Sequence, residues 1–174
     1  ITFNLRGTSD SGRDIDIPAV TDENGVAIFS EIPIGTYTIY EDEKTVPTAY
    51  LVADPQNVTV TYAETKEVPI ENKEKTGSIK VHKKTADMTN VEGIRFILSG
   101  ISDTGREIRI EATTDKDGLA KFEGVPVGTY TITEDGSTVP YGYLVADSKQ
   151  VTVAYAQTVD TDMVNEKAPD TPNT

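Results

Sequence analysis

The stretch TDKDGLAKFEGVPVGTYTITE, residues 114–134, decides the fold of this 174-residue chain. Its last six residues, 129–134, alternate apolar and polar side chains, and a period of two is typical of a strand with one buried face. Asp117-Gly118 and residues 125–128 interrupt the alternating runs with turn-forming residues. Similar short runs and turns fill the rest of the chain, so the sequence predicts an all-β fold of the sandwich type.

The chain contains one segment written twice without a gap, at residues 1–75 and 94–168. Equivalent residues lie 93 positions apart, such as Tyr37 and Tyr130, Glu41 and Glu134, and Asn72 and Asn165. The second copy is preceded by an alternating run, residues 77–84, that has no counterpart before Ile1. We therefore expect a domain at 1–75 that lacks its first strand, a complete domain at 76–168, and a linker or sorting-signal remnant at 169–174.

Composition restricts the partners that the chain can have. The 16 basic and 29 acidic residues give a net charge of −13, which would repel nucleic acid and anionic membranes alike. The sequence has no apolar run of the length that spans a bilayer, so no membrane insertion of this segment is expected. Cysteine is absent, so any covalent staple for a small domain must be of another kind.

Strand phase directs three polar side chains into the core of the second domain. Lys83 has the parity of two apolar residues before it on the same strand, and Glu134 and Asn165 share the parity of apolar residues on theirs. Buried charges pair closely or become neutral, and a neutral amine is a nucleophile. One hypothesis is that Lys83 attacks the side-chain carbonyl of Asn165 while Glu134 transfers protons, so that ammonia leaves and an isopeptide bond remains. The alternative is a partly solvated salt bridge between Lys83 and Glu134.

Three runs carry a resemblance to a known family: residues 114–122, residues 125–134 and the Pro-Tyr-Gly-Tyr segment at 140–143. Together with their first-copy equivalents at 22–41, Pro47 and Tyr50, they resemble the collagen-adhesin B-type (Cna B, SpaA-like) repeats of Gram-positive surface proteins and pilins. The resemblance covers nearly the whole chain. It implies two tandem prealbumin-like β-sandwiches, which are Ig-like with inverse topology.

Many domains of that family form an isopeptide bond between a first-strand lysine and a last-strand asparagine, assisted by a glutamate. The resemblance implies that Lys83 and Asn165 are crosslinked and that Glu134 is catalytic in the second domain. In the first domain Glu41 and Asn72 match the family pattern, but no lysine stands on the missing strand, so Asn72 forms an unpaired half-site. Lys44, Lys66 and Lys73 align elsewhere.

The resemblance also implies a function: a structural stalk or pilus-shaft module of a cell-wall-anchored, extracellular surface protein. Its partners would be neighbouring domains or subunits of a surface fibre. The alternative is an adhesin module that binds a host protein or glycan. No cofactor and no enzymatic turnover are expected, because the candidate chemistry is internal and occurs once. Residues 171–174 resemble the P-x-T part of a sortase sorting signal with Thr174 as the joined residue, and an ordinary linker explains them equally well.

Two further patterns have simpler interpretations. The Asp115-x-Asp117-Gly118 run resembles the start of a calcium loop, but the later ligands are out of register and a hairpin turn explains it better, so no metal is expected. Four repeated aromatic pairs follow strand phase and are interpreted as core: Phe3 and Phe96, Phe29 and Phe122, Tyr37 and Tyr130, and Tyr62 and Tyr155.

Overall fold

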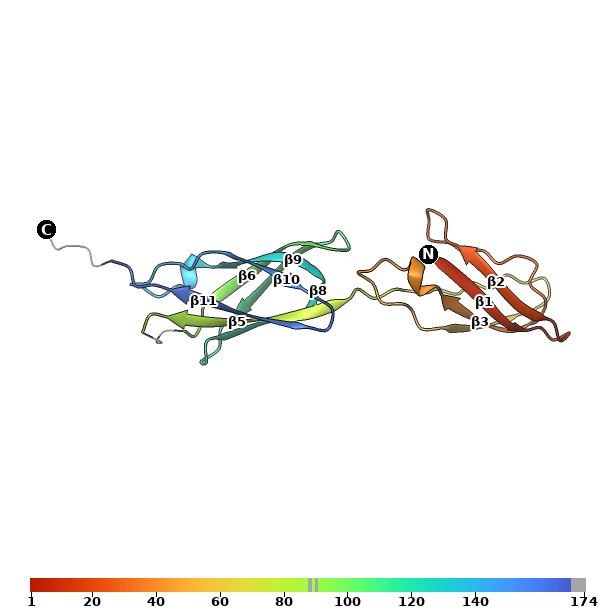
Figure 1. Cartoon of the computed structure of the whole chain (residues 1–174), viewed down its shortest axis with the longest axis horizontal. Coiled ribbons are helices and arrows are strands. Elements are labelled where there is room, and N and C mark those ends of the chain that lie inside the picture. The colour runs from red at the N-terminus through yellow and green to blue at the C-terminus, as the bar shows by residue number, and fades with distance from the viewer. Residues whose placement is uncertain (88, 90, 170–174) are drawn as a thin grey trace. The chain divides into compact units, whose positions relative to one another are not determined.

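A computed structural model describes residues 1–87, 89 and 91–169 of the chain. The chain divides into two compact units, unit 1 at Ile1–Lys73 and unit 2 at Glu74–Thr174. Both consist of strands and short turns, and each unit is described by itself (Figure 1). The predicted all-β class is confirmed. Among the described residues, no helix has the length and apolar character needed to cross a membrane.

Unit 2 is a sandwich of two sheets. Its strands are β5 (Thr76–Thr85), β6 (Arg95–Ser102), β7 (Glu107–Thr113), β8 (Leu119–Pro126), β9 (Gly128–Glu134), β10 (Lys149–Val153) and β11 (Thr158–Asn165). A single 3-10 turn, η2 (Gly136–Thr138), follows β9. One sheet has the strand order β10-β9-β6-β7 and the other has the order β11-β5-β8.

The core of unit 2 lies between these sheets because each strand turns its apolar parity inward. In β5, burial alternates residue by residue along the whole strand. The buried core consists of Ile79, Val81, Ile94, Phe96, Leu98, Ile108, Ala120, Phe122, Val125, Tyr130, Ile132, Val151, Val153 and Met163. Each fully buried aliphatic or aromatic side chain contributes about 1.5–3 kcal/mol by leaving water.

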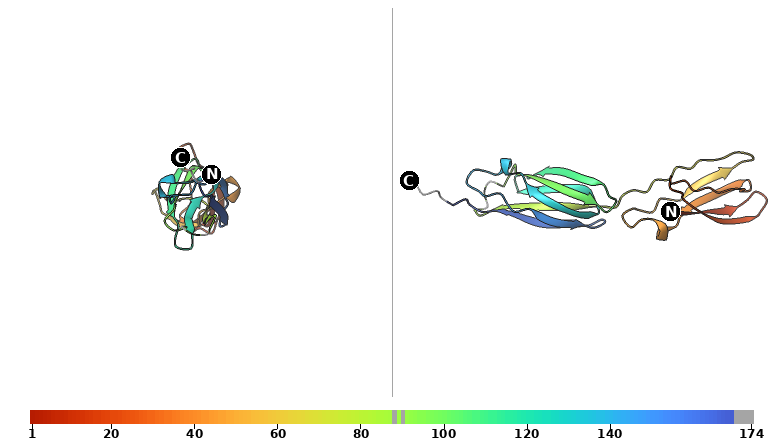
Figure 2. Two further views of the ribbon diagram at one scale, coloured as in Figure 1. Left: turned by 90° about the vertical axis from the view of Figure 1, so that its left-hand side faces the viewer. Right: turned by 90° about the horizontal axis from the view of Figure 1, so that it is seen from above.

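The middle strand of the smaller sheet is β5, the first strand of unit 2. It pairs in parallel with β11, the last strand, and antiparallel with β8. Figures 1 and 2 show β5 in yellow-green beside β11 in blue. The two ends of unit 2 are therefore joined by one ladder of backbone hydrogen bonds, and removing β5 would leave both of its neighbours without a partner.

Unit 1 forms the equivalent of only the larger sheet. Its strands are β1 (Thr2–Thr8), β2 (Asp14–Val20), β3 (Gly35–Glu41) and β4 (Gln56–Val60), with the 3-10 turn η1 (Glu43–Thr45) after β3. The strand order is β2-β1-β3-β4, and its core is Leu5, Ile15, Tyr37 and Ile39. Phe29, Ile32, Val68 and Ile70 still pack on this core, although they are only partly buried.

Val26 and Ile28 belong to one of the alternating runs of the first copy, for which the sequence predicts a strand, but no strand is formed there. Residues 26–33 and 65–72 align with β8 and β11 of unit 2, yet neither segment contains a strand. Val26 and Ile28 are 51% and 73% exposed. Apolar residues do recur at alternate positions in both segments, but a strand also needs a hydrogen-bonded neighbour. For both segments that neighbour would be the counterpart of β5.

The prediction that Tyr62 and Tyr155 belong to the core is wrong. They are 89% and 50% exposed, because β4 and β10 end two residues earlier and both tyrosines lie in the following turn. A left-handed residue, Ala63 or Ala156, follows each of them and breaks the strand phase. The other aromatic pairs pack on the two cores, those of unit 2 completely and Phe3 and Phe29 partly.

Candidate functional site

Lys83 lies near the end of β5 with its side chain entirely buried. Its Nζ atom is 3.4 Å from Oε1 of Glu134, whose side chain is also fully buried. The ammonium also donates to the backbone oxygens of Lys84 at 2.9 Å and Met163 at 3.3 Å. The inward orientation that strand phase predicted is confirmed, and the amine faces a carboxylate whose side chain is also buried.

Asn165 ends β11 and lies on the other side of the same carboxylate. Its Nδ2 atom donates to Oε2 of Glu134 at 2.6 Å and to the backbone oxygen of Leu144. The backbone N–H of Ala146 donates to the same Oε2 at 2.7 Å. Glu134 therefore contacts Lys83 through one oxygen and Asn165 through the other, and the three residues come from three different strands.

Asn165 Oδ1 is buried and accepts no hydrogen bond from the residues that the structure describes. Buried polar atoms normally have a partner, so an unsatisfied amide oxygen requires an explanation. An oxygen that is free in the folded state can accept a proton or a hydrogen bond as charge develops on it during attack at the amide carbon.

Burial lowers the pKa of Lys83, because the ammonium has lost its water. The charge of the nearby Glu134 carboxylate raises the pKa and opposes this effect only in part. The neutral, nucleophilic amine is therefore more accessible than that of an ordinary lysine.

A glycine in the turn directly before the neighbouring strand β8 allows the backbone of Lys83 to come close. The Lys83 N–H donates to the carbonyl of Gly118 at 2.7 Å, and Gly118 has a φ of +74°. A Cβ at this position would lie 2.8 Å from the Lys83 carbonyl oxygen. Asp115 forms the preceding turn by accepting from the N–H groups of Asp117 and Leu119, so the calcium-like sequence is a turn.

Sequence reasoning missed a polar cluster at the end of β5. The hydroxyl of Tyr143 is 2.7 Å from both carboxylate oxygens of Asp87, and Lys167 Nζ is 3.2 Å from Oδ2. Hydrogen bonds from Tyr143 and Thr89 hold the pKa of Asp87 well below its usual range. The cluster ties the residues after β5 to those after β11, and no sequence pattern links residues so far apart.

Unit 1 contains the same carboxylate–amide pair without a lysine. Asn72 Nδ2 donates to Glu41 Oε2 at 2.7 Å and to the Leu51 oxygen at 2.9 Å, and the Ala53 N–H donates to the same Oε2 at 2.7 Å. Glu41 Oε1, the equivalent of the oxygen that faces Lys83, is buried without a hydrogen-bond partner among the described residues.

The lysines of unit 1 lie elsewhere on its surface. Lys66 pairs with Glu64 at 2.6 Å, and Lys44 and Lys73 are exposed. Thr174, the sequence-predicted sortase-type residue, and the rest of its motif at 171–174 lie outside the described residues.

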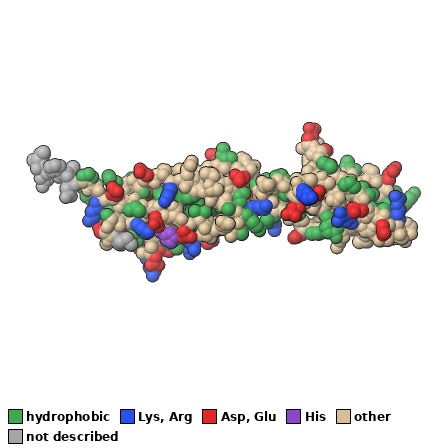
Figure 3. Space-filling model, in the orientation of Figure 1, with side chains coloured by type: hydrophobic (Ala, Val, Ile, Leu, Met, Phe, Trp, Pro, Cys, Tyr) green, Lys and Arg blue, Asp and Glu red, His purple; other side chains and the backbone are tan. Residues whose placement is uncertain are grey.

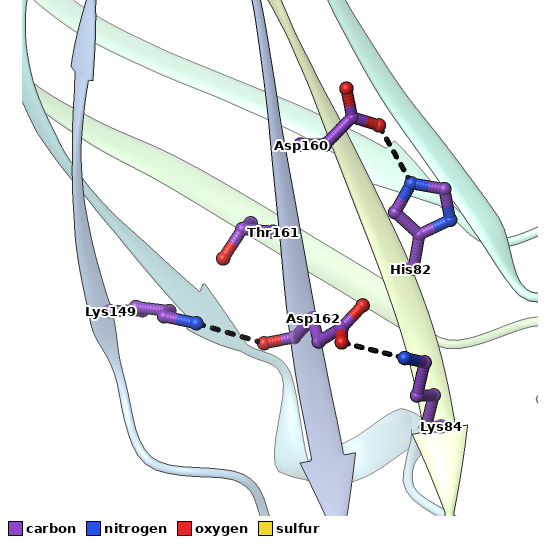
Figure 4. A pocket seen from close by; sticks show the side chains of 6 residues that line it. All are labelled: His82, Lys84, Lys149, Asp160, Thr161 and Asp162. Carbon is purple, nitrogen blue, oxygen red and sulfur yellow. Dashed lines mark hydrogen bonds and ion pairs between the residues drawn. The ribbon is translucent and has the colours of Figure 1, made fainter.

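The outer face of the β5–β11 pair carries a shallow hollow of self-paired charges (Figure 4). His82 pairs with Asp160 at 2.8 Å, and Lys84 pairs with Asp162 at 2.6 Å. Lys149 donates to the backbone oxygen of Asp162 at 3.3 Å. Outside residues 88, 90 and 170–174, no group of three or more His, Cys, Asp or Glu side chains is placed to hold a metal ion.

Unit 2 is therefore an all-β sandwich whose interior contains the amine of Lys83, the carboxylate of Glu134 and the amide of Asn165. The model of the family described as SpaA, prealbumin-like fold domain, matches residues 1–74 and 77–167. The chain therefore belongs to this family. No match to a curated protein sequence was found.

One solved structure has the same fold, and two pilin structures are matched with lower scores. The structure of the Bacillus anthracis TIE protein is similar with a TM-score of 0.65 and 22% identity, and the match covers 95% of this chain and 30% of that one. The minor pilin GBS52 of Streptococcus agalactiae is matched with a TM-score of 0.49 and 20% identity, over 99% of this chain and 84% of that one. The shaft pilin SpaA of Lactobacillus rhamnosus GG is matched with a TM-score of 0.46 and 16% identity, over 98% and 88%.

Proposed function

We propose that the chain is a structural module of a cell-wall-anchored surface protein, a stalk or pilus-shaft segment, in which Lys83 and Asn165 join by a self-generated isopeptide bond. One observation carries the proposal: the buried carboxylate of Glu134 contacts the amine through one oxygen and the amide nitrogen through the other, at 3.4 and 2.6 Å. A salt bridge alone would not need the asparagine or its unsatisfied oxygen.

The contacts of Lys83, Glu134 and Asn165 support the steps of the proposed exchange. Lys83 passes a proton to Glu134 Oε1, and the resulting neutral amine attacks Cγ of Asn165 while charge develops on Oδ1. The protonated Glu134 then delivers that proton to Nδ2, the Cγ–Nδ2 bond breaks, and the new Nζ–Cγ amide remains. Two of the three ammonium protons reach the leaving nitrogen, which departs as ammonium, and Glu134 returns to a carboxylate. The reaction occurs once per molecule, so the role is structural and not that of an enzyme with turnover.

The bond would stabilise unit 2 and redirect force through it. Closing a loop of about 80 residues between positions 83 and 165 is worth about 4–5 kcal/mol in the chain-entropy model used for disulfides. Both residues stand near the downstream ends of two adjacent parallel strands. Tension that enters at Thr76 would pass along β5 to Lys83 and leave at Asn165, so residues 84–164 would carry none of it.

The cellular setting is inferred from the family and from what the neighbouring structures are. GBS52 and the Lactobacillus rhamnosus protein are pilins of Gram-positive bacteria. An extracellular position on such a surface suits a cysteine-free chain that would gain its covalent staple from lysine and asparagine. Partners in that setting are neighbouring subunits or domains of the same fibre.

A second role, binding a host protein or glycan, is favoured by one observation. In the segment after η2, Tyr141 is fully exposed and Leu144 and Val145 are 47% and 50% exposed. These residues form a short stretch, and on the face seen in Figure 3 hydrophobic side chains are interspersed with charged ones. A structural role therefore ranks first.

Peptide mapping tests the proposed bond. Digestion of the wild-type chain should give a branched peptide that contains both Lys83 and Asn165, and Glu134→Gln, which keeps the shape and removes the base, should give the two linear peptides. Lys83→Met, a volume-conserving change to an apolar core residue, should also remove the branch. Linear Lys83 and Asn165 peptides from the folded wild-type chain would refute the bond.

A further inference from the structure

The carboxylate of Asp87 accepts hydrogen bonds from several groups at one end of unit 2, where β5 and β11 both end (Figure 1). The hydroxyl of Tyr143 lies 2.7 Å from each of its oxygens, and the hydroxyl of Thr89 donates to Oδ1 at 2.8 Å. Lys167 Nζ is 3.2 Å from Oδ2. These four residues form the Asp87 cluster, which joins three segments that lie apart in the sequence.

The first of the three segments follows β5, the strand that carries the amine. Asp87 stands four residues beyond Lys83. Between them, the N–H of Ala86 donates to the backbone oxygen of Asn165 at 3.2 Å. The contacts of Asp87 therefore fix the turn that ends β5 and, through it, the end of the strand from which Lys83 points inward.

The other two segments hold the amide and the carboxylate. The backbone oxygen of Leu144 accepts from Asn165 Nδ2, and the N–H of Ala146 donates to Glu134 Oε2 at 2.7 Å. The chain after β11 is tied to the same segment, because the N–H of Leu144 donates to the backbone oxygen of Glu166 at 2.8 Å. Each of these segments lies directly next to a residue of the Asp87 cluster, so the cluster joins the supports of all three reacting groups.

Of the three reacting groups, the amine is held least closely. Asn165 Nδ2 is 2.6 Å from the carboxylate of Glu134, whereas Lys83 Nζ is 3.4 Å from it. The amide and the carboxylate therefore fix each other, and the position of the amine depends on the end of β5. A misplacement of about 1 Å can cost on the order of a hundredfold in rate when two groups must react with each other.

We propose that Asp87 is a positioning residue for the crosslink of unit 2. Its carboxylate ties the end of β5 to the segments after η2 and after β11, and it thereby holds Lys83 Nζ against Cγ of Asn165. This role rests on the exchange proposed above for the same site. Asp87 acts through the backbone of the three segments and exchanges no proton with the reacting groups.

Tyr143 is the main partner of Asp87 in this role. The side chain of Lys167 is 62% exposed, and an exposed ion pair contributes little. Hydrogen bonds from Tyr143 and Thr89 lower the pKa of Asp87, so the carboxylate is charged at neutral pH. Hydrogen bonds to an ionised acceptor are stronger than those between neutral groups.

The test follows crosslinking in the full chain as it folds. Chain purified in denaturant is diluted to start folding, circular dichroism reports the folding, and intact mass reports the loss of one ammonia. After folding is complete, Asp87→Ala and Tyr143→Phe should each lose ammonia about ten- to a hundredfold more slowly than the wild-type chain. The double variant should be no slower than Asp87→Ala, because both changes break the same contact. Asp87→Glu, which keeps the charge, should restore part of the rate.

A matched control and two further measurements separate positioning from a general loss of stability. Asp162→Asn removes another carboxylate between β5 and β11, the partner of Lys84 on the outer face, and should crosslink at the wild-type rate. Unfolding in urea is compared in the Lys83→Met background, which cannot crosslink, so that stability is measured apart from the bond. The variants of Asp87 should slow the reaction by the same factor across the neutral pH range, because Asp87 gives up no proton in it.

The outcomes distinguish this role from the proposed bond. Wild-type rates in both Asp87→Ala and Tyr143→Phe would overturn the positioning role and leave the bond intact, and so would an equally slow Asp162→Asn or a shifted pH profile. If Asp87→Ala does not fold, Tyr143→Phe, which removes only a hydroxyl, decides by the same criterion. A folded wild-type chain that loses no ammonia would contradict the bond and the positioning role together.

Discussion

Units 1 and 2 share one sequence pattern, and unit 1 differs by having no counterpart of β5. Even so, unit 1 has no counterpart of the whole smaller sheet of unit 2. Unit 2 has β11-β5-β8 as its second layer, and unit 1 has no strand in the equivalent segments 26–33 and 65–72. The difference shows that alternation in the sequence specifies which face of a strand is buried, but it does not supply the neighbouring strand that forms its hydrogen bonds. β5 is the middle strand, so its absence removes the hydrogen-bonding neighbour of both segments.

The buried carboxylate–amide pair, in contrast to the smaller sheet, is present in both units. Glu41 and Asn72 keep their mutual hydrogen bond although the strand that would bring a lysine is missing. Glu41 is held by β3, and the Ala53 N–H fixes the same carboxylate oxygen. The Glu41–Asn72 hydrogen bond is therefore kept without a counterpart of β5, and Glu41 is positioned by the larger sheet and its loop.

The largest contrast should come from removing the two equivalent carboxylates. Glu134→Ala is expected to lower the free energy of unfolding of unit 2 by at least about 4 kcal/mol, because the crosslink is lost and Lys83 is left buried without its partner. Glu41→Ala should cost unit 1 about 1–3 kcal/mol, the value of its lost hydrogen bonds. Urea denaturation followed by circular dichroism measures both, and equal losses would contradict a crosslink confined to unit 2.

The second largest contrast should appear in hydrogen exchange. It should distinguish the two strands that flank β5 in unit 2 from the equivalent segments of unit 1. Amides of β8 and β11 that bond to β5 are expected to exchange with the global unfolding of unit 2, over hours or longer. Amides of residues 26–33 and 65–72 should exchange within the first minutes, since no strand partner protects them. Mass-spectrometric exchange resolves the segments, and matching protection would show that unit 1 has a second layer.

Two equivalent glycines give a sharper, smaller contrast. Gly118 and Gly25 both have positive φ, +74° and +79°, so alanine strains either by about 1 kcal/mol. A Cβ at Gly118 also meets the Lys83 carbonyl at 2.8 Å, whereas a Cβ at Gly25 meets nothing within 4 Å. Gly118→Ala should therefore cost about 1–3 kcal/mol more than Gly25→Ala and slow crosslinking. Melting temperatures and crosslink yield test this, and equal costs would mean that the approach of β5 is not tight.

Lowering the pH should have the smallest effect of these four changes. It should lower the stability of the two units equally. The pKa of Asp22 and that of Asp115 are both lowered from 3.8, chiefly by backbone hydrogen bonds from Val26 and Leu119. A depressed folded-state pKa gives stability that is present above the unfolded value and is lost as pH falls through the folded value. Asp22→Asn and Asp115→Asn should each flatten the acid limb of their own unit slightly. NMR titration of the carboxyls reports the shifts, and a shift in only one unit would break the equivalence.

Much of the fold could be predicted because its signals are local. Period-two alternation identified the strands of the larger sheet and the inward parity of Lys83, Glu134 and Asn165, all of which are buried. Tyr62 and Tyr155 were misplaced because a strand that ends two residues early leaves the same alternation in the sequence.

What could not be predicted depends on pairing between distant residues. The register that sets Lys83 against Met163 joins residues 80 apart, and no repeat or turn encodes it. The Asp87–Tyr143–Lys167 cluster is likewise long-range. Residues 26–33 contain no strand, and alternation within the segment does not supply the hydrogen-bonding neighbour that a strand needs.

The intact mass of the folded chain tests the central claim most directly, because it counts the bonds in both units at once. The account predicts a mass one ammonia below the sequence value for the wild-type chain and for Glu41→Ala, and the full sequence mass for Glu134→Ala. An unshifted wild-type mass, or a loss of two ammonia molecules, would contradict an isopeptide bond that forms in unit 2 alone.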